Sequence, residues 1–331
     1  MDLRLLLFYF LFLPSALGHF PSSVSHDVSC LLEFKKGILS DPSGLVISSW
    51  TPPQPPESNH SGAAAPACPS SWNGVSCDAS GADVVSVFLD GLGLRGEIKF
   101  ATLAGMRSLR ELSLSGNFLT GRLVPALGSL ASLHRLDLSG NLFYGPIPGR
   151  IAELWSLVHL NLSCNDFSGD FPTGFQNLLG LKELDLRSNG LRGHIGLVLS
   201  HMRNVEYLDL SGNEFYGGLL MESRNLSSLA NAVKYANLSS NKLSGSFFSS
   251  DSLRLFRNLE VLDVGYNQLS GELPSFDSLR NLKTLRAGKN QLSGLIPEEL
   301  FRSTMSLTEL DLSGNRFTGK YVTFCIPLHM I

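Results

Sequence analysis

Charged residues are scarce in this chain. Only 17% of its 331 residues are Asp, Glu, Lys or Arg, against about 25% in an average soluble protein. The formal net charge is -3, and no long run of Lys or Arg interrupts the sequence. Because binding to nucleic acid normally needs a basic patch, we expect no nucleic-acid partner.

Long apolar runs are also missing after the N-terminus. The first residues, MDLRLLLFYFLFLPSALGHF, combine a weakly basic start at Arg4, an apolar run and the small residues Ala16 and Gly18. This pattern predicts a secretory signal peptide over residues 1–18. An uncleaved anchor is the alternative, but the run is shorter than the roughly 20 residues that cross a bilayer.

Cysteines are few and odd in number. No CxxC pair or His/Cys cluster suggests a metal site, so we expect neither metal nor cofactor. Cys68 and Cys77, in CPSSWNGVSC, are nine residues apart. They predict a disulfide in the oxidising secretory pathway, stabilising the fold by about 2–3 kcal/mol. Cys30 and Cys164 are expected to be buried thiols, and Cys325 has no obvious partner, so the odd count indicates a missing element.

What the sequence has in abundance is a repeat. The frame LxxLxLxxN, as in LHRLDLSGN and LVHLNLSCN, returns every 23 to 28 residues. This period predicts an α/β leucine-rich repeat solenoid, a curved right-handed stack with a concave parallel β-sheet. About ten repeats are expected over residues 84–319, the last incomplete, with Leu92 in the asparagine slot of the first. The asparagines are Asn117, Asn141, Asn165, Asn189, Asn213, Asn241, Asn267, Asn290 and Asn315.

Each slot of the repeat has a physical reason. The two leucines of LxL point inward from a short strand, and the residue between them points outward. The asparagine amide can bond backbone groups that the turn leaves unpaired. These asparagines are therefore expected to be structural, and losing one should cost about 1–3 kcal/mol.

The segments around the repeats carry a resemblance. After the asparagine comes [LF]xGx[ILF]P, as in LFYGPIP, FSGDFP, LSGELP and LSGLIP, and the sequence here resembles the plant-specific class of leucine-rich repeat. Residues 19–83, with HDVSCLLEFKKGIL, DPSG and CPSSWNGVSC, resemble the helical N-terminal cap of plant leucine-rich repeat receptor-like kinases and receptor-like proteins. Within that family they are most similar to the branch of the guard-cell hydrogen-peroxide-resistance receptor. The Pro-rich residues 51–71 exceed what such a cap needs and predict a surface loop.

Two short motifs resemble enzyme signatures but belong to the repeat. GLGLRG, residues 91–96, matches GxGxxG, yet its glycines occupy turn slots and no helix is expected to open there. HRLDLSGN, residues 134–141, has the leucines and asparagine of the repeat frame, and the other kinase motifs are absent. We expect no catalytic residues in this chain. The resemblance implies that a full-length relative carries a Ser/Thr kinase or pseudokinase domain.

The remaining candidates lie on the expected concave surface. Tyr207 and Tyr235 are adjacent in one column of the repeat, His159 and Arg187 precede them, and Val261 and Arg286 follow. Aromatic residues and Arg commonly anchor interfaces, so these six are predicted partner-binding residues. The alternative is that they are ordinary exposed positions of a sheet. The longer intervals nearby, with GGLLMESRNLSSLANAV, mark inserted residues on a functional face or neutral drift.

Four Asn-x-Ser sequons predict glycosylation in a secreted protein: Asn59, Asn161, Asn225 and Asn237. The register places Asn161 and Asn237 on the concave face. A glycan on Asn237 would partly cover Tyr235, so full occupancy conflicts with a binding site there.

The C-terminal residues 320–331 form an atypical tail. YVTFCIPLHMI is apolar but too short to span a membrane, and no second cap closes the solenoid. We therefore expect a receptor ectodomain cut short, or a short secreted form, with membrane association only through a C-terminal part missing from the chain. Three functions stay open: a sensing ectodomain that binds an extracellular peptide, small ligand or co-receptor ectodomain; a secreted competitor for that ligand; or a polygalacturonase-inhibitor-like defence protein.

Overall fold

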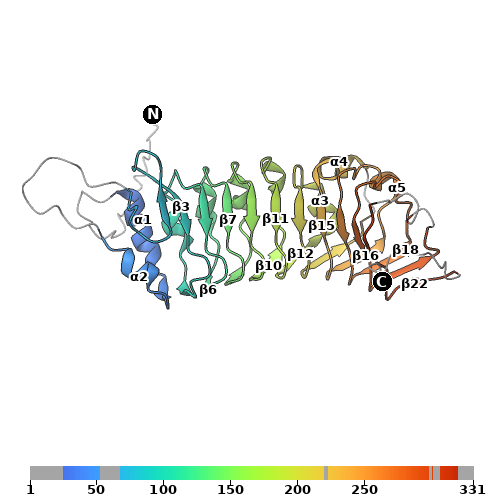
Figure 1. Ribbon diagram of the computed structural model, residues 1–331, viewed down its shortest axis with the longest axis horizontal. Helices are drawn as coiled ribbons and strands as arrows, with labels where there is room; N and C mark the ends of the chain where they lie inside the picture. The colour runs from blue at the N-terminus through green and yellow to red at the C-terminus, as the bar shows by residue number, and fades with distance from the viewer. Residues whose placement is uncertain (1–24, 53–67, 220–222, 298–299, 301–305, 320–331) are drawn as a thin grey trace, which may run out of the picture.

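A computed structural model describes residues 25–52, 68–219, 223–297, 300 and 306–319. The chain winds into an elongated stack of coils, with the N-terminal cap at one end and the last repeats at the other (Figure 1). Each coil contributes a strand to each of two long sheets, and short helices complete the turn. The predicted leucine-rich repeat solenoid is confirmed.

The first sheet is the predicted concave one. Its strands run parallel from β3 onward, and β2 of the cap adds antiparallel to β3. Its strands are β2 (Val75–Cys77), β3 (Val84–Phe88), β5 (Glu111–Ser113), β7 (Arg135–Asp137), β9 (His159–Asn161), β11 (Glu183–Asp185), β13 (Tyr207–Asp209), β15 (Tyr235–Asn237), β17 (Val261–Asp263), β19 (Thr284–Arg286) and β21 (Glu309–Asp311).

A second sheet, which the repeat pattern did not predict, has a strand after each repeat asparagine from Asn117 onward, and β4 of the first repeat and β1 of the cap extend it. The xGx segments of the repeats form these strands. The second residue of such a strand is apolar and buried, as at Leu119 and Phe143. Its strands are β1 (Ile38–Ser40), β4 (Arg95–Glu97), β6 (Phe118–Gly121), β8 (Leu142–Gly145), β10 (Asp166–Asp170), β12 (Gly190–His194), β14 (Glu214–Gly217), β16 (Lys242–Ser246), β18 (Gln268–Glu272), β20 (Gln291–Gly294) and β22 (Arg316–Phe317).

Helices cap the stack and line its third side. The cap holds α1 (His26–Lys35) and α2 (Leu45–Ser49), and α1 begins at Ser25, whose hydroxyl accepts the Val28 N–H. The others are η1 (Phe100–Leu103), η2 (Pro125–Ser129), η3 (Gly149–Glu153), η4 (Phe175–Asn177), α3 (Ile195–Ser200), α4 (Ser223–Ala232) and α5 (Ser250–Leu253). The inserted residues after Gly218 therefore lie outside the concave sheet, and part of them forms α4.

The repeat asparagines hold adjacent coils together. Asn141 Nδ2 donates to the carbonyls of Leu114, Leu138 and Ser139 at 2.8–3.1 Å, and its Oδ1 accepts the Leu119 N–H at 3.0 Å. The same four bonds recur at the other asparagines of the series. Each amide thus forms hydrogen bonds with backbone groups of two coils. Inside the core these groups would otherwise lack a hydrogen-bond partner.

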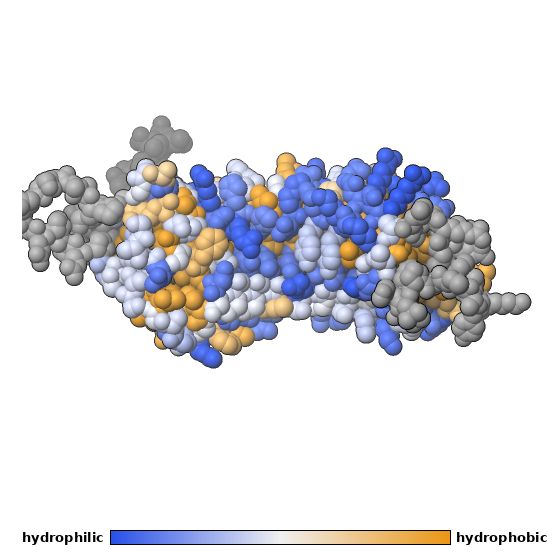
Figure 2. Space-filling model, viewed as in Figure 1, coloured by the Kyte–Doolittle hydropathy of each residue, from blue (hydrophilic) through white to orange (hydrophobic). Residues whose placement is uncertain are grey.

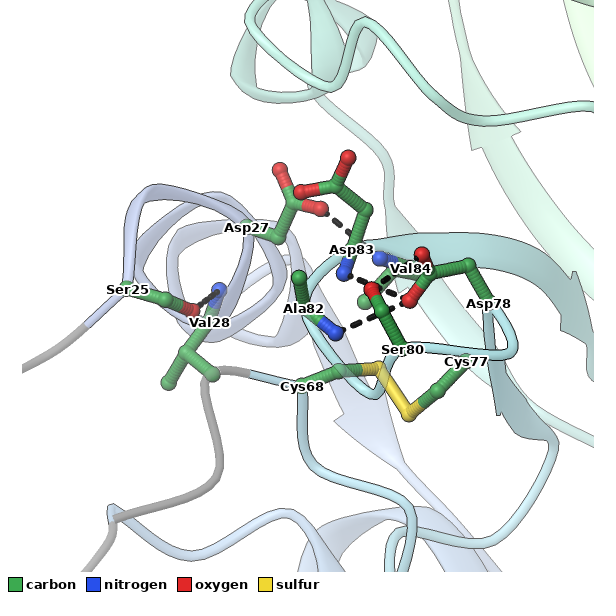
Figure 3. Close-up of a disulfide and its surroundings, with 10 residues drawn as sticks. All are labelled: Ser25, Asp27, Val28, Cys68, Cys77, Asp78, Ser80, Ala82, Asp83 and Val84. Atoms are coloured by element: carbon green, nitrogen blue, oxygen red, sulfur yellow. Dashed lines mark hydrogen bonds between the residues drawn. A yellow bond between two sulfur atoms is a disulfide. The ribbon is translucent and has the colours of Figure 1, made fainter. Parts of the chain in front are cut away.

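The cap is joined to the first repeat by packing, by a disulfide and by a buried carboxylate. Cys68 and Cys77 form the predicted disulfide, beside the end of α1 that carries Asp27 (Figure 3). Asp27 accepts the Val84 N–H at 2.9 Å, and burial raises the pKa of its carboxyl. Trp50 is fully buried and stacks on Trp72 at 5.4 Å.

Two sequence expectations about thiols have different outcomes. Cys30 is buried in α1 as predicted, but Cys164 is exposed, so its predicted burial is wrong. Cys164 takes a left-handed backbone with φ of 53° at the turn before Asn165, in the slot that Gly140 fills one repeat earlier, and its side chain projects outward there. The predicted signal peptide, Cys325, Asn59 and the C-terminal tail lie outside the described residues.

Within the described residues, no helix is long and apolar enough to cross a membrane. The GLGLRG segment contains turns and β4, with Gly91 and Gly93 at φ of 65° and 68°. No helix begins at Gly96, and the repeat interpretation predicted this.

Candidate functional site: a charged hollow beside a tyrosine pair

A hollow of about 310 Å³ lies on the concave sheet, across β7, β9, β11 and β13. Leu136 and Leu160 form part of its wall, and the rest is polar or aromatic. The lining side chains are Arg135, Asp137, His159, Asn161, Glu183, Asp185, Arg187 and Tyr207. Hydrophilic residues dominate the visible surface around β7 and β11, whereas apolar residues gather toward the N-terminal end (Figure 2).

Strand register sets the order of side chains along the sheet. The first residues of successive strands are register partners and form one row, which we call the tyrosine row: Arg135, His159, Glu183, Tyr207, Tyr235, Val261, Thr284 and Glu309. Four of the six predicted binding residues lie in it, namely His159, Tyr207, Tyr235 and Val261. Arg187 lies beyond the strand end and contributes to the hollow, and Arg286 belongs to the last position of β19.

Tyr207 and Tyr235 form a stacked pair at one end of the hollow. Their ring centroids are 4.4 Å apart and their planes are inclined by 8°. Burial raises the pKa of both phenols, more strongly for Tyr207, with the carboxylate of Asp209 as a further cause. Both side chains therefore stay protonated at physiological pH and offer an uncharged hydroxyl to a ligand.

The last residues of β11 and β13 are two buried aspartates. Asp185 and Asp209 are register partners, 8% and 1% exposed. Arg187 Nη1 lies 3.5 Å from Asp185 Oδ2 and 3.9 Å from Asp209 Oδ2. Burial raises the pKa of Asp185 to about 6; its bond from the Arg187 N–H and the guanidinium of Arg187 oppose that rise, and Asp209 and Asp137 add to it. One guanidinium thus serves two buried carboxylates.

Other charges in the hollow are paired. Arg135 Nη2 donates to Asp137 Oδ2 at 3.1 Å. His159 Nδ1 lies 2.8 Å from Glu183 Oε2, but the approach lacks hydrogen-bond geometry and leaves the buried nitrogen without a bond.

Arg286 is engaged elsewhere. Its Nε and Nη2 donate to the two carboxylate oxygens of Glu309 at 2.6 and 2.8 Å, and its Nη1 lies 3.5 Å from Asp263. Such a two-bond pairing occupies the guanidinium. The structure thus separates Arg286 from the residues that line the hollow.

The two concave sequons differ in their surroundings. Asn161 lines the hollow, and its Oδ1 accepts the Ser163 N–H and hydroxyl. Asn237 Nδ2, the atom that a glycan would modify, donates to Asp209 Oδ2 at 3.3 Å and to the Tyr235 hydroxyl at 3.5 Å. Asn225 lies in α4, away from the concave sheet.

Sequence reasoning missed Arg135, Glu183, Asp185 and Asp209 as site residues. A sequence signal existed in the two adjacent repeats LKELDLRSN and VEYLDLSGN, which place two carboxylates in register beside one Arg. Within the described residues, no group of three or more His, Cys, Asp or Glu is placed to hold a metal ion.

Family models match most of the described chain. A leucine-rich repeat N-terminal domain model matches residues 24–78, and leucine-rich repeat models match 156–215 and five further segments between 108 and 326. A probable inactive receptor kinase of Arabidopsis thaliana is 60% identical over 294 residues, which is 88% of this chain and 27% of the relative. The chain belongs to the leucine-rich repeat family.

Another relative fits the predicted branch. The LRR receptor-like serine/threonine-protein kinase GHR1 of Arabidopsis thaliana is 41% identical over 129 residues, 39% of this chain and 11% of the relative. The chain thus spans about a quarter or less of the length of these two receptor kinases.

Solved structures of plant receptor ectodomains share the fold. The ectodomain of the membrane receptor kinase GASSHO1/SCHENGEN3 from Arabidopsis thaliana, in complex with CASPARIAN STRIP INTEGRITY FACTOR 2, aligns with a TM-score of 0.76 and 31% identity. The alignment covers 89% of this chain and 33% of that one. The Arabidopsis receptor kinase HAESA, in complex with the peptide hormone IDA and the co-receptor SERK1, aligns with a TM-score of 0.56 and 29% identity, over 89% and 54% of the two chains.

Proposed function

We propose that this chain is the ligand-sensing extracellular region of a plant receptor-like kinase and binds an extracellular peptide on its concave sheet. The observation that carries the proposal is the hollow across β7 to β13, continuous with the stacked Tyr207 and Tyr235. A concave site with charged groups and an aromatic anchor has the composition of a binding hot spot. The peptide complexes of the GASSHO1/SCHENGEN3 and HAESA ectodomains support the same use of the fold.

The proposed role needs no catalysis by the chain itself. The leucine-rich repeat region would bind the ligand, a co-receptor ectodomain would join it, and signalling would pass to parts of the receptor beyond this region. Its location would be the extracellular side of the plasma membrane, reached through the secretory pathway. The name of the relative with 60% identity, a probable inactive receptor kinase, supports a full-length protein that signals through association.

Peptide selection tests the binding site. A phage library of random dodecapeptides would be panned against the purified chain, and enriched peptides would be measured by titration calorimetry. The test variant is Tyr207→Ala/Tyr235→Ala, and the matched control is Tyr144→Ala/Tyr216→Ala on the second sheet, whose side chains are also exposed. We expect the test variant to lose about tenfold or more in affinity, since aromatic anchors that a ligand covers dominate interfaces, and the control to lose none.

Two outcomes would contradict the proposal. One is that no peptide is enriched, or that the enriched peptides bind the concave variant as tightly as the unmodified chain. The other is glycopeptide mapping that finds glycans on both Asn161 and Asn237, because sugars there would occupy the hollow and its tyrosine border.

Fractionation tests the receptor assignment separately. An antibody against the cap should detect a membrane-bound product far larger than this chain in plant tissue. A soluble extracellular product of the size of this chain would instead favour the secreted competitor.

A further inference from the structure

The charges around the hollow do not balance. Asp137, Glu183 and Asp185 line it and Asp209 lies beside Asp185 on the neighbouring strand, whereas Arg135 and Arg187 are the guanidinium groups in the lining. Arg135 is bonded to Asp137, which leaves Arg187 to face both Asp185 and Asp209. The hollow therefore carries surplus negative charge in a partly desolvated place, where an added cation is attracted more strongly than in water.

Asp185 has an oxygen available for that cation. Its Oδ1 accepts the Arg187 N–H at 3.1 Å. Its Oδ2 lies 3.5 Å from the Arg187 guanidinium, and no hydrogen bond to it is found within the described part of the chain. A carboxylate that is 8% exposed and incompletely bonded is costly to keep ionised. A ligand donor that reaches Oδ2 would remove part of that cost.

Tyr207 supplies an aromatic face to the same space. The 4.4 Å separation between the Tyr207 and Tyr235 rings is close to the roughly 4.8 Å spacing of neighbouring strands. The rings therefore face along the row, so one face of Tyr207 is covered by Tyr235 and the other is turned toward β11 and the hollow. Cations bind well over such a face, and a planar guanidinium stacks on it.

We propose that the hollow binds the side chain of an arginine in the peptide ligand, with the guanidinium between the carboxylate of Asp185 and the open face of Tyr207. This inference rests on the proposed peptide-binding function and names the residue that the site selects. A guanidinium suits the geometry because it can donate to Asp185 Oδ2 in its plane while one flat side lies on the ring. A lysine ammonium reaches the carboxylate but lacks the flat side, so it binds more weakly.

The test uses peptides selected by the phage library described above. We expect them to share an arginine at one position. Replacing that arginine with citrulline, which keeps the shape and removes the charge, should weaken binding about tenfold, as expected for a charge-assisted bond that is lost. Replacing it with lysine should give an intermediate loss.

A double-mutant cycle locates the arginine. Asp185→Asn keeps the acceptor for the Arg187 N–H and removes the charge, and Asp311→Asn is the control in the same row at the far end of the sheet. Asp185→Asn should weaken binding of the arginine peptide about tenfold but leave the citrulline peptide unchanged, since coupled partners are not additive. Asp311→Asn should show the full citrulline effect.

The outcomes separate this inference from the function it rests on. Selected peptides that need Tyr207 and Tyr235 but carry Asp or Glu, or that tolerate citrulline, would overturn the arginine site and leave concave peptide binding intact. A citrulline effect of equal size in the chain and in Asp185→Asn would place the arginine elsewhere and also overturn it. Peptides that ignore the tyrosine pair would overturn both.

Discussion

Asp185 and Asp209 lie side by side in adjacent strands and share one guanidinium, that of Arg187, at 3.5 and 3.9 Å. Two carboxylates held together at low exposure repel each other, and burial disfavours the charge of each. The sheet tolerates this arrangement because the register of the repeat fixes both positions. The unfavourable electrostatic energy of these carboxylates is concentrated at the place where a ligand is proposed to bind.

The stability of the chain should depend on the ionisation of Asp185. Its pKa is raised from 3.8 to about 6 in the folded chain, so the folded state holds the proton more tightly than the unfolded state. Stability therefore falls as pH rises through the window from about 4 to 6. Asp185→Asn removes this loss, so its free energy of unfolding relative to the unmodified chain should increase by about 2 kcal/mol between pH 4 and pH 7, a figure reduced for partial solvation.

Urea titrations at pH 4, 5, 6 and 7 measure this change, because urea is uncharged and does not screen the carboxylate. The difference between the two proteins at pH 4 serves as the reference, since the carboxyl is mostly protonated there in the folded chain. A difference that stays constant with pH would show that Asp185 is not desolvated as described.

The repeat asparagines should be costly to remove. Asn141→Ala leaves the Leu119 N–H without its partner inside the core and removes one of two asparagine bonds from each of the carbonyls of Leu114 and Leu138. We expect a loss of about 1–3 kcal/mol in the free energy of unfolding. Asn204→Ala is the matched control, because Asn204 also donates to a carbonyl, that of Leu179, but at an exposed position. Equal losses in the two variants would argue against the ladder as a stabilising element.

The two described free thiols should react very differently. Cys164 is exposed, whereas burial, with Asp27 nearby, raises the pKa of Cys30 to about 11. Since the thiolate is the reactive form, maleimide at pH 7.5 should label Cys164 within minutes in the folded chain and leave Cys30 unlabelled. Peptide mass spectrometry reads both sites, and labelling in guanidinium should modify both. Rapid labelling of Cys30 without denaturant would mean that α1 opens in the folded state.

The repeat pattern predicts the fold well because it is a local rule applied many times. The LxL and asparagine slots each have one physical use, so the concave strands, the buried leucines and the asparagine bonds follow from spacing alone. Tyr207 and Tyr235 are predictable for the same reason, since identical slots in consecutive strands become neighbours.

Other features depend on how coils contact each other. The second sheet forms because the xGx segments of adjacent coils come into register, which no single repeat shows. The exposure of Cys164 follows from a left-handed turn, with φ of 53°, that Gly fills in some repeats and Ser, Tyr or Lys in others. The hollow needs Asp185, Asp209 and Arg187 together, and each looks like ordinary filler when its repeat is considered alone.

Arg286 should contribute to stability and not to ligand binding. Glu309 holds its guanidinium through two bonds of 2.6 and 2.8 Å, and Asp263 lies 3.5 Å away. Both partners of the main pair are about 42–43% exposed, so Arg286→Ala should cost no more than about 1 kcal/mol. Its affinity for the selected peptides should stay within about twofold, whereas Tyr207→Ala should lose about tenfold. Calorimetry on the two variants measures this contrast. Equal losses would extend the binding surface to β19, because Arg286 would then have to leave Glu309 for the ligand.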